Sequence, residues 1–169
     1  MKIGVMADSH DRLPAIQELL KRFMAAGCGM VLHAGDFCSP FSLNPFLEAN
    51  IPMAGIFGRN DGDPEGIRAQ AARGIAIELY ESPHSFEVAG RQILMVHEIA
   101  DVGKRSVHKH DFVIHASSHQ VEMKTRGNSI MLNPGEACGW LYGTPQAMIV
   151  DLETKKVDFV QLIGPEWSR

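Results

Sequence analysis

Five side chains of types that bind metal ions each follow an apolar run of the sequence. Asp8 and His10 come directly after the first run, Asp36 follows the second, and His97 and His119 follow two later ones. Two carboxylates with three imidazoles suit first-row metals such as manganese, iron, zinc or nickel better than calcium or magnesium. The pattern therefore predicts a site for a divalent metal ion.

Each of these residues taken alone has a simpler interpretation. Asp8 could cap a helix, Gly35-Asp36 could form a turn, and a lone histidine such as His97 is more often a core residue. These simpler interpretations are less convincing for the whole set, because each residue follows an apolar run and functional groups gather where the strands of a parallel sheet end. Asp8 and His10 are two residues apart, so an extended backbone would point both side chains to the same side.

The first half of the chain alternates between strand and helix patterns. Apolar runs predict strands over residues 2–7, 30–34 and 52–57, and apolar periodicity predicts helices over 14–24 and 64–73, with a shorter one within 40–50. Pro14 suits the first turn of the first helix, and Gly27 suits its end. Alternating strands and helices imply a parallel sheet.

The second half of the chain changes to hairpin patterns. Paired apolar runs flank turn residues at 85–89 and 91–96, at 121–124 and 129–132, and at 147–151 and 157–162, and a further strand is predicted over 111–116. Parallel units followed by hairpins predict mixed sheets with outer helices. We expect residues 1–169 to form one domain.

The composition is that of a soluble globular protein. Of the 169 residues, 45% are hydrophobic and 21% are charged, and the net charge of −4 argues against a nucleic-acid surface or an anionic membrane as partner. No apolar stretch is long enough to span a bilayer, and the N-terminus runs directly into a strand, unlike a signal peptide. The scattered Cys28, Cys38 and Cys138 are typical of reduced thiols, which predicts a cytoplasmic location.

Six short motifs occur in a fixed order along the chain: Asp8-Ser9-His10, His33-Ala34-Gly35-Asp36, Phe57-Gly58-Arg59-Asn60-Asp61-Gly62-Asp63, Met95-Val96-His97, Ala116-Ser117-Ser118-His119 and Asn133-Pro134-Gly135-Glu136. Through them nearly the whole chain resembles the calcineurin-like metallophosphoesterases, in particular their small bacterial and archaeal phosphodiesterase branch. The resemblance implies an α/β fold, a sandwich of two mixed β-sheets flanked by helices. It also implies two metal ions and a bridging hydroxide that attacks phosphorus.

The resemblance also assigns metal ligands. Asp8, His10, Asp36 and His119 match the ligands of the first metal; Asp36 would bridge to the second metal, which His97 would also bind. Two positions depart from the family pattern. An asparagine ligand is replaced by Arg59 and a histidine by Ser117, and both losses fall on the second metal. We therefore expect one tightly bound divalent metal, manganese before iron, zinc or nickel, and a weak or absent second one.

Arg59 has three interpretations, because an arginine has no lone pair with which to bind a metal. It could replace the second cation and hold a substrate phosphate with two parallel hydrogen bonds, with Ser117 as a further substrate contact. The second site could instead have decayed, leaving Arg59 to fill space or to pair with Asp61 or Asp63. Thirdly, the loop could shift by one residue so that Asn60 supplies the ligand.

These observations predict a metal-dependent phosphoesterase that acts on a phosphodiester or a small phosphorylated metabolite through a metal-activated water. Its candidate catalytic residues are Asp36, Arg59, which would stabilise phosphoryl charge, and His97, which could protonate the leaving group if no second metal binds. The alternative is a non-catalytic metal-binding or protein-interaction module on the same fold, as in a subunit of the eukaryotic retromer. A homo-oligomer is compatible with either function.

Overall fold

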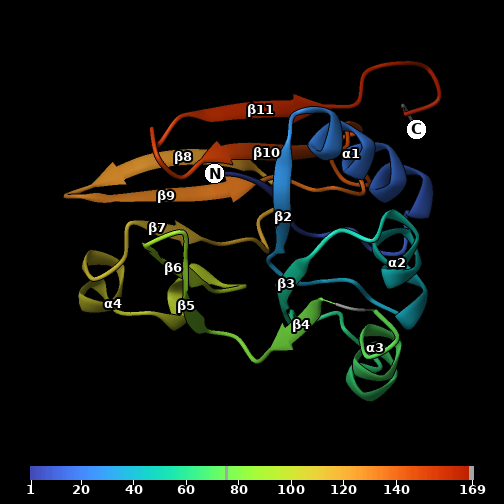
Figure 1. The fold of residues 1–169 in the computed structure, drawn as a ribbon, viewed down its shortest axis with the longest axis horizontal. Helices are drawn as coiled ribbons and strands as arrows, with labels where there is room; N and C mark the ends of the chain where they lie inside the picture. The colour runs from blue at the N-terminus through green and yellow to red at the C-terminus, as the bar shows by residue number, and fades with distance from the viewer. Residues whose placement is uncertain (75, 168–169) are drawn as a thin grey trace.

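The computed structural model describes residues 1–74 and 76–167. Within them, eleven strands form two mixed β-sheets that face each other, and helices cover the outer face of each sheet (Figure 1). This arrangement confirms the predicted α/β sandwich of two mixed sheets with outer helices. No helix among the described residues combines the length and apolar character needed to cross a bilayer.

The larger sheet has the strand order β11-β10-β1-β2-β3-β4. Its strands are β1 (Lys2–Met6), β2 (Cys28–His33), β3 (Met53–Ile56), β4 (Ile77–Tyr80), β10 (Gln146–Asp151) and β11 (Val157–Gln161). The first four run parallel, and the last two form a hairpin that pairs antiparallel with β1. The loops after β1, β2 and β3 therefore leave the same edge of the sheet.

The smaller sheet has the order β5-β6-β7-β9-β8. Its strands are β5 (His84–Val88), β6 (Arg91–Met95), β7 (Phe112–Ile114), β8 (Val121–Arg126) and β9 (Ser129–Pro134). The three central strands β6, β7 and β9 run parallel, and β5 and β8 pair antiparallel at the two edges. This sheet too has a set of loops that leave one edge together.

Helices complete the layers. The helices α1 (Leu13–Ala25), α2 (Asn44–Ala49) and α3 (Pro64–Ala71) and the 3-10 turn η1 (Pro40–Leu43) lie on the larger sheet, and α4 (Lys104–His108) lies on the smaller one, preceded by the turn η2 (Ile99–Asp101) (Figure 1). Pro14 stands in the first turn of α1, where its missing N–H costs no hydrogen bond. The buried face of α1 includes Ile16, Leu19 and Phe23.

Alternate residues of the strand β1 belong to two different apolar clusters of the core. In β1, Ile3 and Val5 belong to the apolar cluster between the two sheets, whereas Met6 belongs to the cluster under the helices. Successive residues of a strand point to opposite faces, so both faces of this central strand are buried. The burial fixes the height at which β1 ends, and therefore where the residues after it lie.

Three elements were not predicted from the sequence: β4, α4 and η2. The strand β4 is short, lies at the edge of its sheet and is only half-buried, so its apolar signal is weak. In α4 only Val107 is buried, and the surrounding Lys and His residues indicated a solvated stretch. The other predicted elements occur, with bounds that differ by a few residues.

Close packing of α1 on β1 makes a stability prediction. A Cβ atom on Gly4 would lie 2.4 Å from Cδ2 of the buried Phe23, inside van der Waals contact. We expect Gly4→Ala to lower the free energy of unfolding by about 1–3 kcal/mol, because the ring must move within a filled core. Denaturant unfolding measures this. Gly62→Ala is the control, because its Cβ would meet no atom within 4 Å; equal midpoints for the two variants would contradict the packing argument.

Candidate metal centre and active site

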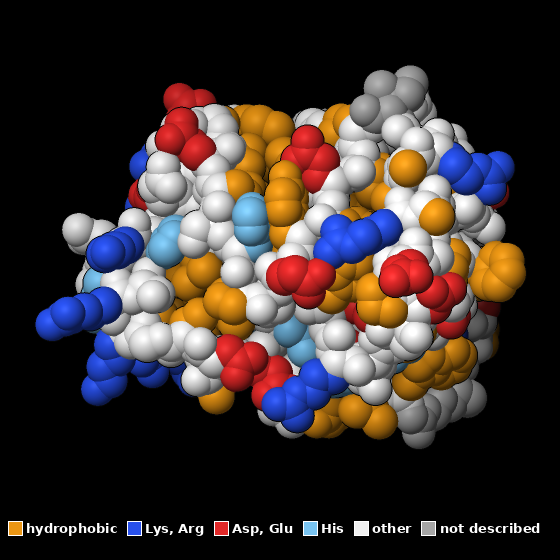
Figure 2. All heavy atoms as spheres, turned by 90° about the horizontal axis from the view of Figure 1, so that it is seen from below, with side chains coloured by type: hydrophobic (Ala, Val, Ile, Leu, Met, Phe, Trp, Pro, Cys, Tyr) orange, Lys and Arg blue, Asp and Glu red, His pale blue; other side chains and the backbone are white. Residues whose placement is uncertain are grey.

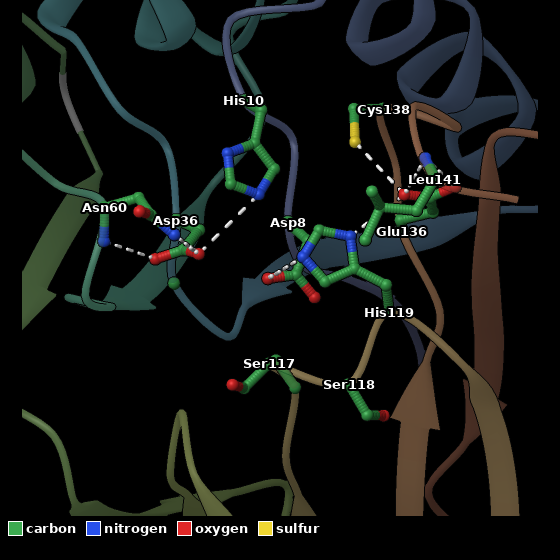
Figure 3. Close-up of polar contacts among 12 residues, drawn as sticks. Asp8, His10, Asp36, Asn60, Ser117, Ser118, His119, Glu136, Cys138 and Leu141 are labelled. Carbon is green, nitrogen blue, oxygen red and sulfur yellow. Dashed lines mark hydrogen bonds and ion pairs between the residues drawn. The ribbon is translucent and has the colours of Figure 1, made fainter.

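The candidate residues meet at the carboxyl ends of parallel strands from both sheets. Asp8 and His10 follow β1 and Asp36 follows β2, whereas His97 follows β6 and His119 follows β7. In Figure 3 the side chains of Asp8, His10, Asp36 and His119 converge on one space. The larger sheet thus supplies three of the four predicted first-metal ligands and the smaller sheet supplies the fourth.

The loops that carry these residues have an unusual backbone. Asp8, His10, Asp36 and His119 all have positive φ, between 39° and 62°, a region that residues other than glycine adopt rarely. The expectation of an extended backbone at Asp8 and His10 is therefore wrong, although both side chains reach the same site. Hydrogen bonds from the amide of Asp8 to the carbonyl of Gly35 (3.0 Å) and from that of His10 to the carbonyl of Asp36 (3.1 Å) hold the two loops together. Such strained conformations cluster at functional sites.

The four predicted first-metal ligands form a compact donor set. One ligand atom from each of Asp8, His10, Asp36 and His119 can be chosen so that all lie within 4.8 Å of one another. Nε2 of His10 lies 3.6 Å from Oδ2 of Asp36, and Nε2 of His119 lies 3.7 Å from Oδ1 of Asp8. Two carboxylates and two imidazoles at this spacing match the donor types that first-row divalent metals prefer.

Buried polar atoms without partners show that a cation fits this donor set. Asp8 is fully buried, and among the described residues neither of its carboxylate oxygens has a hydrogen-bond partner. Nε2 of His10 is buried without a partner as well. Buried carboxylates are normally paired or coordinate a metal, because an isolated charge is costly to desolvate. Three of the four such atoms among the described residues belong to Asp8 and His10 of the predicted ligand set, and the fourth is Nε2 of His115, outside it.

Burial also alters the protonation of Asp8 in the metal-free protein. It raises the pKa of the Asp8 carboxyl to about 7, although the nearby His119 and His97 act in the opposite direction. The pKa of His10 is lowered, chiefly by burial, so its imidazole is neutral and able to bind a metal at pH 7. Its Nδ1 lies 3.0 Å from Sγ of Cys38, which leaves Nε2 toward the site.

His97 and Asn60 both contact Asp36. Nε2 of His97 lies 3.4 Å from Oδ1 of Asp36, and the backbone and side-chain amides of Asn60 donate to the two Asp36 oxygens at 2.9 and 2.7 Å. Burial opposes ionisation of Asp36, but these hydrogen bonds outweigh it and hold its pKa well below the usual range. Burial likewise opposes protonation of His97, but the hydrogen bonds to Asp36 and to the Ala34 carbonyl raise its pKa to about 9.

Arg59 and Ser117, the two departures from the family pattern, both contact Glu98. The guanidinium of Arg59 is paired with the Glu98 carboxylate, with Nη2 at 2.5 Å from Oε2, and the Arg59 side chain is 73% exposed. Ser117 Oγ donates to Oε1 of Glu98 at 3.4 Å. The expected pairing of Arg59 with Asp61 or Asp63 is therefore replaced by pairing with Glu98. Asn60, not Arg59, reaches Asp36.

Asp61 and Asp63 have local tasks instead. The Asp61 carboxylate accepts hydrogen bonds from the amides of Asp36, Cys38 and Gly58, which joins the loops after β2 and β3. Asp63 caps α3 through the amide of Gly66. A hollow of about 210 Å³ lies beside this loop, and Arg59, His97 and Glu98 contribute to its lining.

Sequence reasoning did not assign a role to Glu136. Its carboxylate is fully buried and accepts a hydrogen bond of 2.9 Å from Nδ1 of His119. In the sequence Glu136 stands out only as the end of a family motif, and no spacing rule connects it with a histidine seventeen positions earlier. Glu98 was missed as well, because its importance comes from its contacts with Arg59 and Ser117.

The comparisons with known proteins agree with this geometry. Residues 1–155 match the family described as the calcineurin-like phosphoesterase superfamily domain. The chain belongs to the calcineurin-like phosphoesterase superfamily. Phosphodiesterase MJ0936 of Methanocaldococcus jannaschii is 29% identical over 160 residues, which cover 92% of this chain and 96% of that protein. A solved structure described as a novel archaeal phosphodiesterase has a TM-score of 0.88 and 28% identity, covering 96% of this chain and 100% of its own.

Two solved structures with lower identity share the fold. The phosphoesterase YfcE from E. coli has a TM-score of 0.68 at 15% identity, and the zinc complex of Vps29 from Entamoeba histolytica has 0.65 at 17%; each likeness covers 96% of this chain and 98% of the other. At such identities the likeness establishes the fold alone. Family membership and the phosphodiesterase relative support metal-dependent phosphoester hydrolysis, and they do not favour the predicted non-catalytic alternative.

The raised pKa of Asp8 predicts how the stability of the metal-free protein and its binding of Mn²⁺ depend on pH. Its folded-state pKa of about 7 lies above the ordinary 3.8, so the metal-free fold binds the extra proton, and the resulting stability is lost as pH rises from about 4 through 7. Metal binding requires the ionised carboxylate. We therefore expect the rise in melting temperature caused by Mn²⁺ to grow between about pH 5 and pH 8.

The variant Asp8→Asn separates the two effects. Without metal at about pH 8, it should be more stable than the wild type by on the order of 2 kcal/mol, because no buried charge forms. It should gain nothing from Mn²⁺. Thermal unfolding in a chelator and in Mn²⁺ measures both, and a variant that is less stable than the wild type in the chelator would refute this account of Asp8.

Proposed function

We propose that this protein hydrolyses phosphodiesters or small phosphorylated metabolites with one tightly bound divalent metal at Asp8, His10, Asp36 and His119. The observation that carries the proposal is the fully buried Asp8 carboxylate, which has no hydrogen-bond partner among the described residues and faces His119. Membership of the phosphoesterase superfamily supplies the reaction class. The mixture of carboxylate and imidazole ligands supports manganese as the first metal to test.

When bound, the metal would supply a water with a pKa lowered to about 7 and a positive charge for the phosphoryl oxygens. The protein's own task at this centre is to hold the ligands. Asp36 is kept ionised by the amides of Asn60 and by His97. The backbone hydrogen bonds between the loops of Asp8 and Asp36 fix the separation of the two carboxylates.

We propose His97 as the proton donor to the leaving oxygen. Its pKa of about 9 means that it carries two ring protons at neutral pH, and Nδ1 donates one of them to the Ala34 carbonyl at 2.8 Å. The proton on Nε2 faces Asp36 and is the one available for transfer. A charged His97 also opposes a second cation at this position, which supports the proposal of one tight metal site.

We propose that the Arg59 guanidinium releases the Glu98 carboxylate and binds the substrate phosphate in its place. Both partners are anions, and a guanidinium forms the same pair of parallel hydrogen bonds with a carboxylate as with a phosphate. The Arg59 side chain is 73% exposed and can turn, whereas Glu98 is 20% exposed and is held by Ser117 as well. Ser117 thus acts on the substrate through Glu98, in addition to the direct contact that the sequence predicted.

We also propose that the protein is cytoplasmic. Its three cysteines are free, and Cys38 lies against the proposed metal ligand His10, where oxidation would disturb the site. On the face shown in Figure 2, Lys and Arg side chains gather at the left edge, and the rest of the face mixes basic, acidic and apolar side chains. The net charge of −4 supports a small phosphorylated substrate in preference to a nucleic-acid duplex, which is bound through positive charge.

Metal titration of three variants tests the assignment of the ligands. Asp8→Ala and His119→Ala should each abolish calorimetric Mn²⁺ binding and hydrolysis of bis-nitrophenyl phosphate, because each removes one of four ligands. His97→Ala should keep the metal but lose activity, because it removes the proton donor. The wild type should bind one tight Mn²⁺ per chain. Two equally tight sites, or equal loss of metal in all three variants, would contradict the proposal.

Phosphate titration of the Mn²⁺-loaded protein tests the exchange at Arg59. Arg59→Asn should weaken phosphate binding by about 2–5-fold, because one charged contact is lost at an exposed site. Glu98→Gln should strengthen phosphate binding, because the competing carboxylate is neutralised. Arg22→Asn is the control, since Arg22 is an exposed arginine paired with Glu18 on α1. If Arg59 marks only a decayed site, all the binding curves should coincide.

A further inference from the structure

We propose that Glu136 is a positioning residue that sets the tautomer and the orientation of His119. Its carboxylate fixes the proton of the imidazole on Nδ1, so that Nε2 presents its lone pair to the metal centre. This inference deepens the proposed function and rests on it only where His119 is taken as a metal ligand. The placement of the imidazole proton can be measured whether or not a metal binds.

The contacts of Glu136 carry the argument. The carboxylate is fully buried, and Oε2 lies 2.9 Å from Nδ1 of His119. It also accepts hydrogen bonds from the backbone amide of Leu141 at 3.0 Å and from that of Tyr142 at 2.6 Å. Cys138 Sγ donates to Oε2 at 3.6 Å. Figure 3 shows Glu136 between His119 on one side and Cys138 and Leu141 on the other.

The identity of these partners decides where the imidazole proton lies. A backbone amide can only donate, so the oxygens of Glu136 act as acceptors. The same carboxylate can therefore bind Nδ1 of His119 only if that nitrogen also donates. With the proton on Nδ1, the lone pair of the neutral imidazole is on Nε2. Nε2 is the nitrogen that lies 3.7 Å from Oδ1 of Asp8 in the candidate metal centre.

The backbone around Glu136 holds the carboxylate in register with the site. The preceding Gly135 has φ of 77°, and a Cβ there would lie 2.5 Å from Oε1 of Gln146, so the turn requires glycine. The amide of Ala137 donates to the Ala7 carbonyl at 2.9 Å, and that of Cys138 donates to the Asp8 carbonyl at 3.1 Å. Glu136 is thus fixed to the same loop that carries Asp8.

A second contact limits rotation of the His119 ring. The rings of His10 and His119 are stacked, with centroids 5.2 Å apart and an angle of 21° between their planes. Stacking restricts the tilt of the ring but does not decide which of its two nitrogens carries the proton. The hydrogen bond to Glu136 decides this, because it places the proton on Nδ1. Carboxylate partners of this kind are worth about 10–100-fold in metal affinity in other metal sites.

The first test is ¹⁵N NMR of histidine in the metal-free wild type, at about pH 9, where an ordinary imidazole is neutral. We expect His119 to carry its proton on Nδ1. In Glu136→Gln the side-chain oxygen can still accept from the backbone amides of Leu141 and Tyr142, and the side-chain NH₂ group then faces Nδ1 of His119. That nitrogen must accept a hydrogen bond, so we expect the imidazole proton to move to Nε2. A proton on Nε2 in the wild type would overturn the proposal, even if the protein binds metal well.

The second test is calorimetric titration with Mn²⁺ alone. Glu136→Gln should weaken Mn²⁺ binding by about 10–100-fold, and Glu136→Asp, which keeps the charge, should restore part of the loss. Glu122→Gln is the matched control, because Glu122 pairs with His115 at 3.3 Å outside the proposed ligand set; it should bind Mn²⁺ like the wild type. Unchanged affinity in Glu136→Gln would overturn the inference.

Two further outcomes remain distinguishable. A wild type that binds no Mn²⁺ would refute the proposed function, while the NMR result would still decide the tautomer. If Glu136→Gln does not fold, as judged by circular dichroism without metal, the wild-type spectrum and Glu136→Asp decide. Glu136→Asp with wild-type unfolding but weaker Mn²⁺ binding than the wild type would support positioning, because a purely structural role changes stability without changing affinity selectively.

Discussion

The Asp8 carboxylate, buried at the end of the central strand β1, is the constraint on which the arrangement of the site depends. It is fully buried and lacks a hydrogen-bond donor among the described residues, a placement that a charged group tolerates only beside a cation or when protonated. The packing of β1 between two apolar layers prevents the group from moving toward solvent. In the neighbouring loops, Asp36 and His119 have positive φ, and this conformation brings their side chains to the Asp8 carboxylate. The conformation is strained, and a bound cation would offset the strain.

Hydrogen-bond donors of His97 and Asn60 contact the other side of Asp36, where the family resemblance implies a second metal ion. Hydrogen bonds to Asp36 and to the Ala34 carbonyl raise the pKa of His97 to about 9, which favours its charged form, and Asn60 contributes two hydrogen-bond donors to the same carboxylate. Arg59 is held nearby by Glu98. The substitutions at residues 59 and 117 therefore have a common consequence, because both new side chains bind Glu98. A charged side chain in this position would supply positive charge without a second metal ion. It would lack the Lewis acidity with which such an ion would polarise a phosphoryl oxygen.

Much of the fold and the residues of the candidate site could be predicted from the sequence, because each site residue follows a buried strand with a clear apolar pattern. The prediction failed for β4 and α4, where few side chains are buried and periodicity carries little information. It also failed for the backbone at Asp8 and His10, because Asp and His are enriched at positive φ but adopt it in only a small fraction of cases, so residue type is a weak signal. The partner of Arg59 could not be foreseen either, since Glu98 approaches it from the other sheet and long-range ion pairs leave no local signature.

The proposed ligands are divided between the two sheets, so a bound metal would have a structural consequence as well as a chemical one. Asp8, His10 and Asp36 belong to loops of the larger sheet, whereas His119 belongs to a loop of the smaller one. Apolar packing between the sheets is non-directional, so it specifies their relative height at this edge less sharply than directional contacts do. A metal bound by all four residues would fix that height, and the contact of Glu136 with His119, together with the hydrogen bond from Cys138 to the Asp8 carbonyl, fixes it by a second route. The same contacts that orient the ligands therefore also align the two sheets, so we regard the geometry of the site and the packing of the sandwich as one property of this fold.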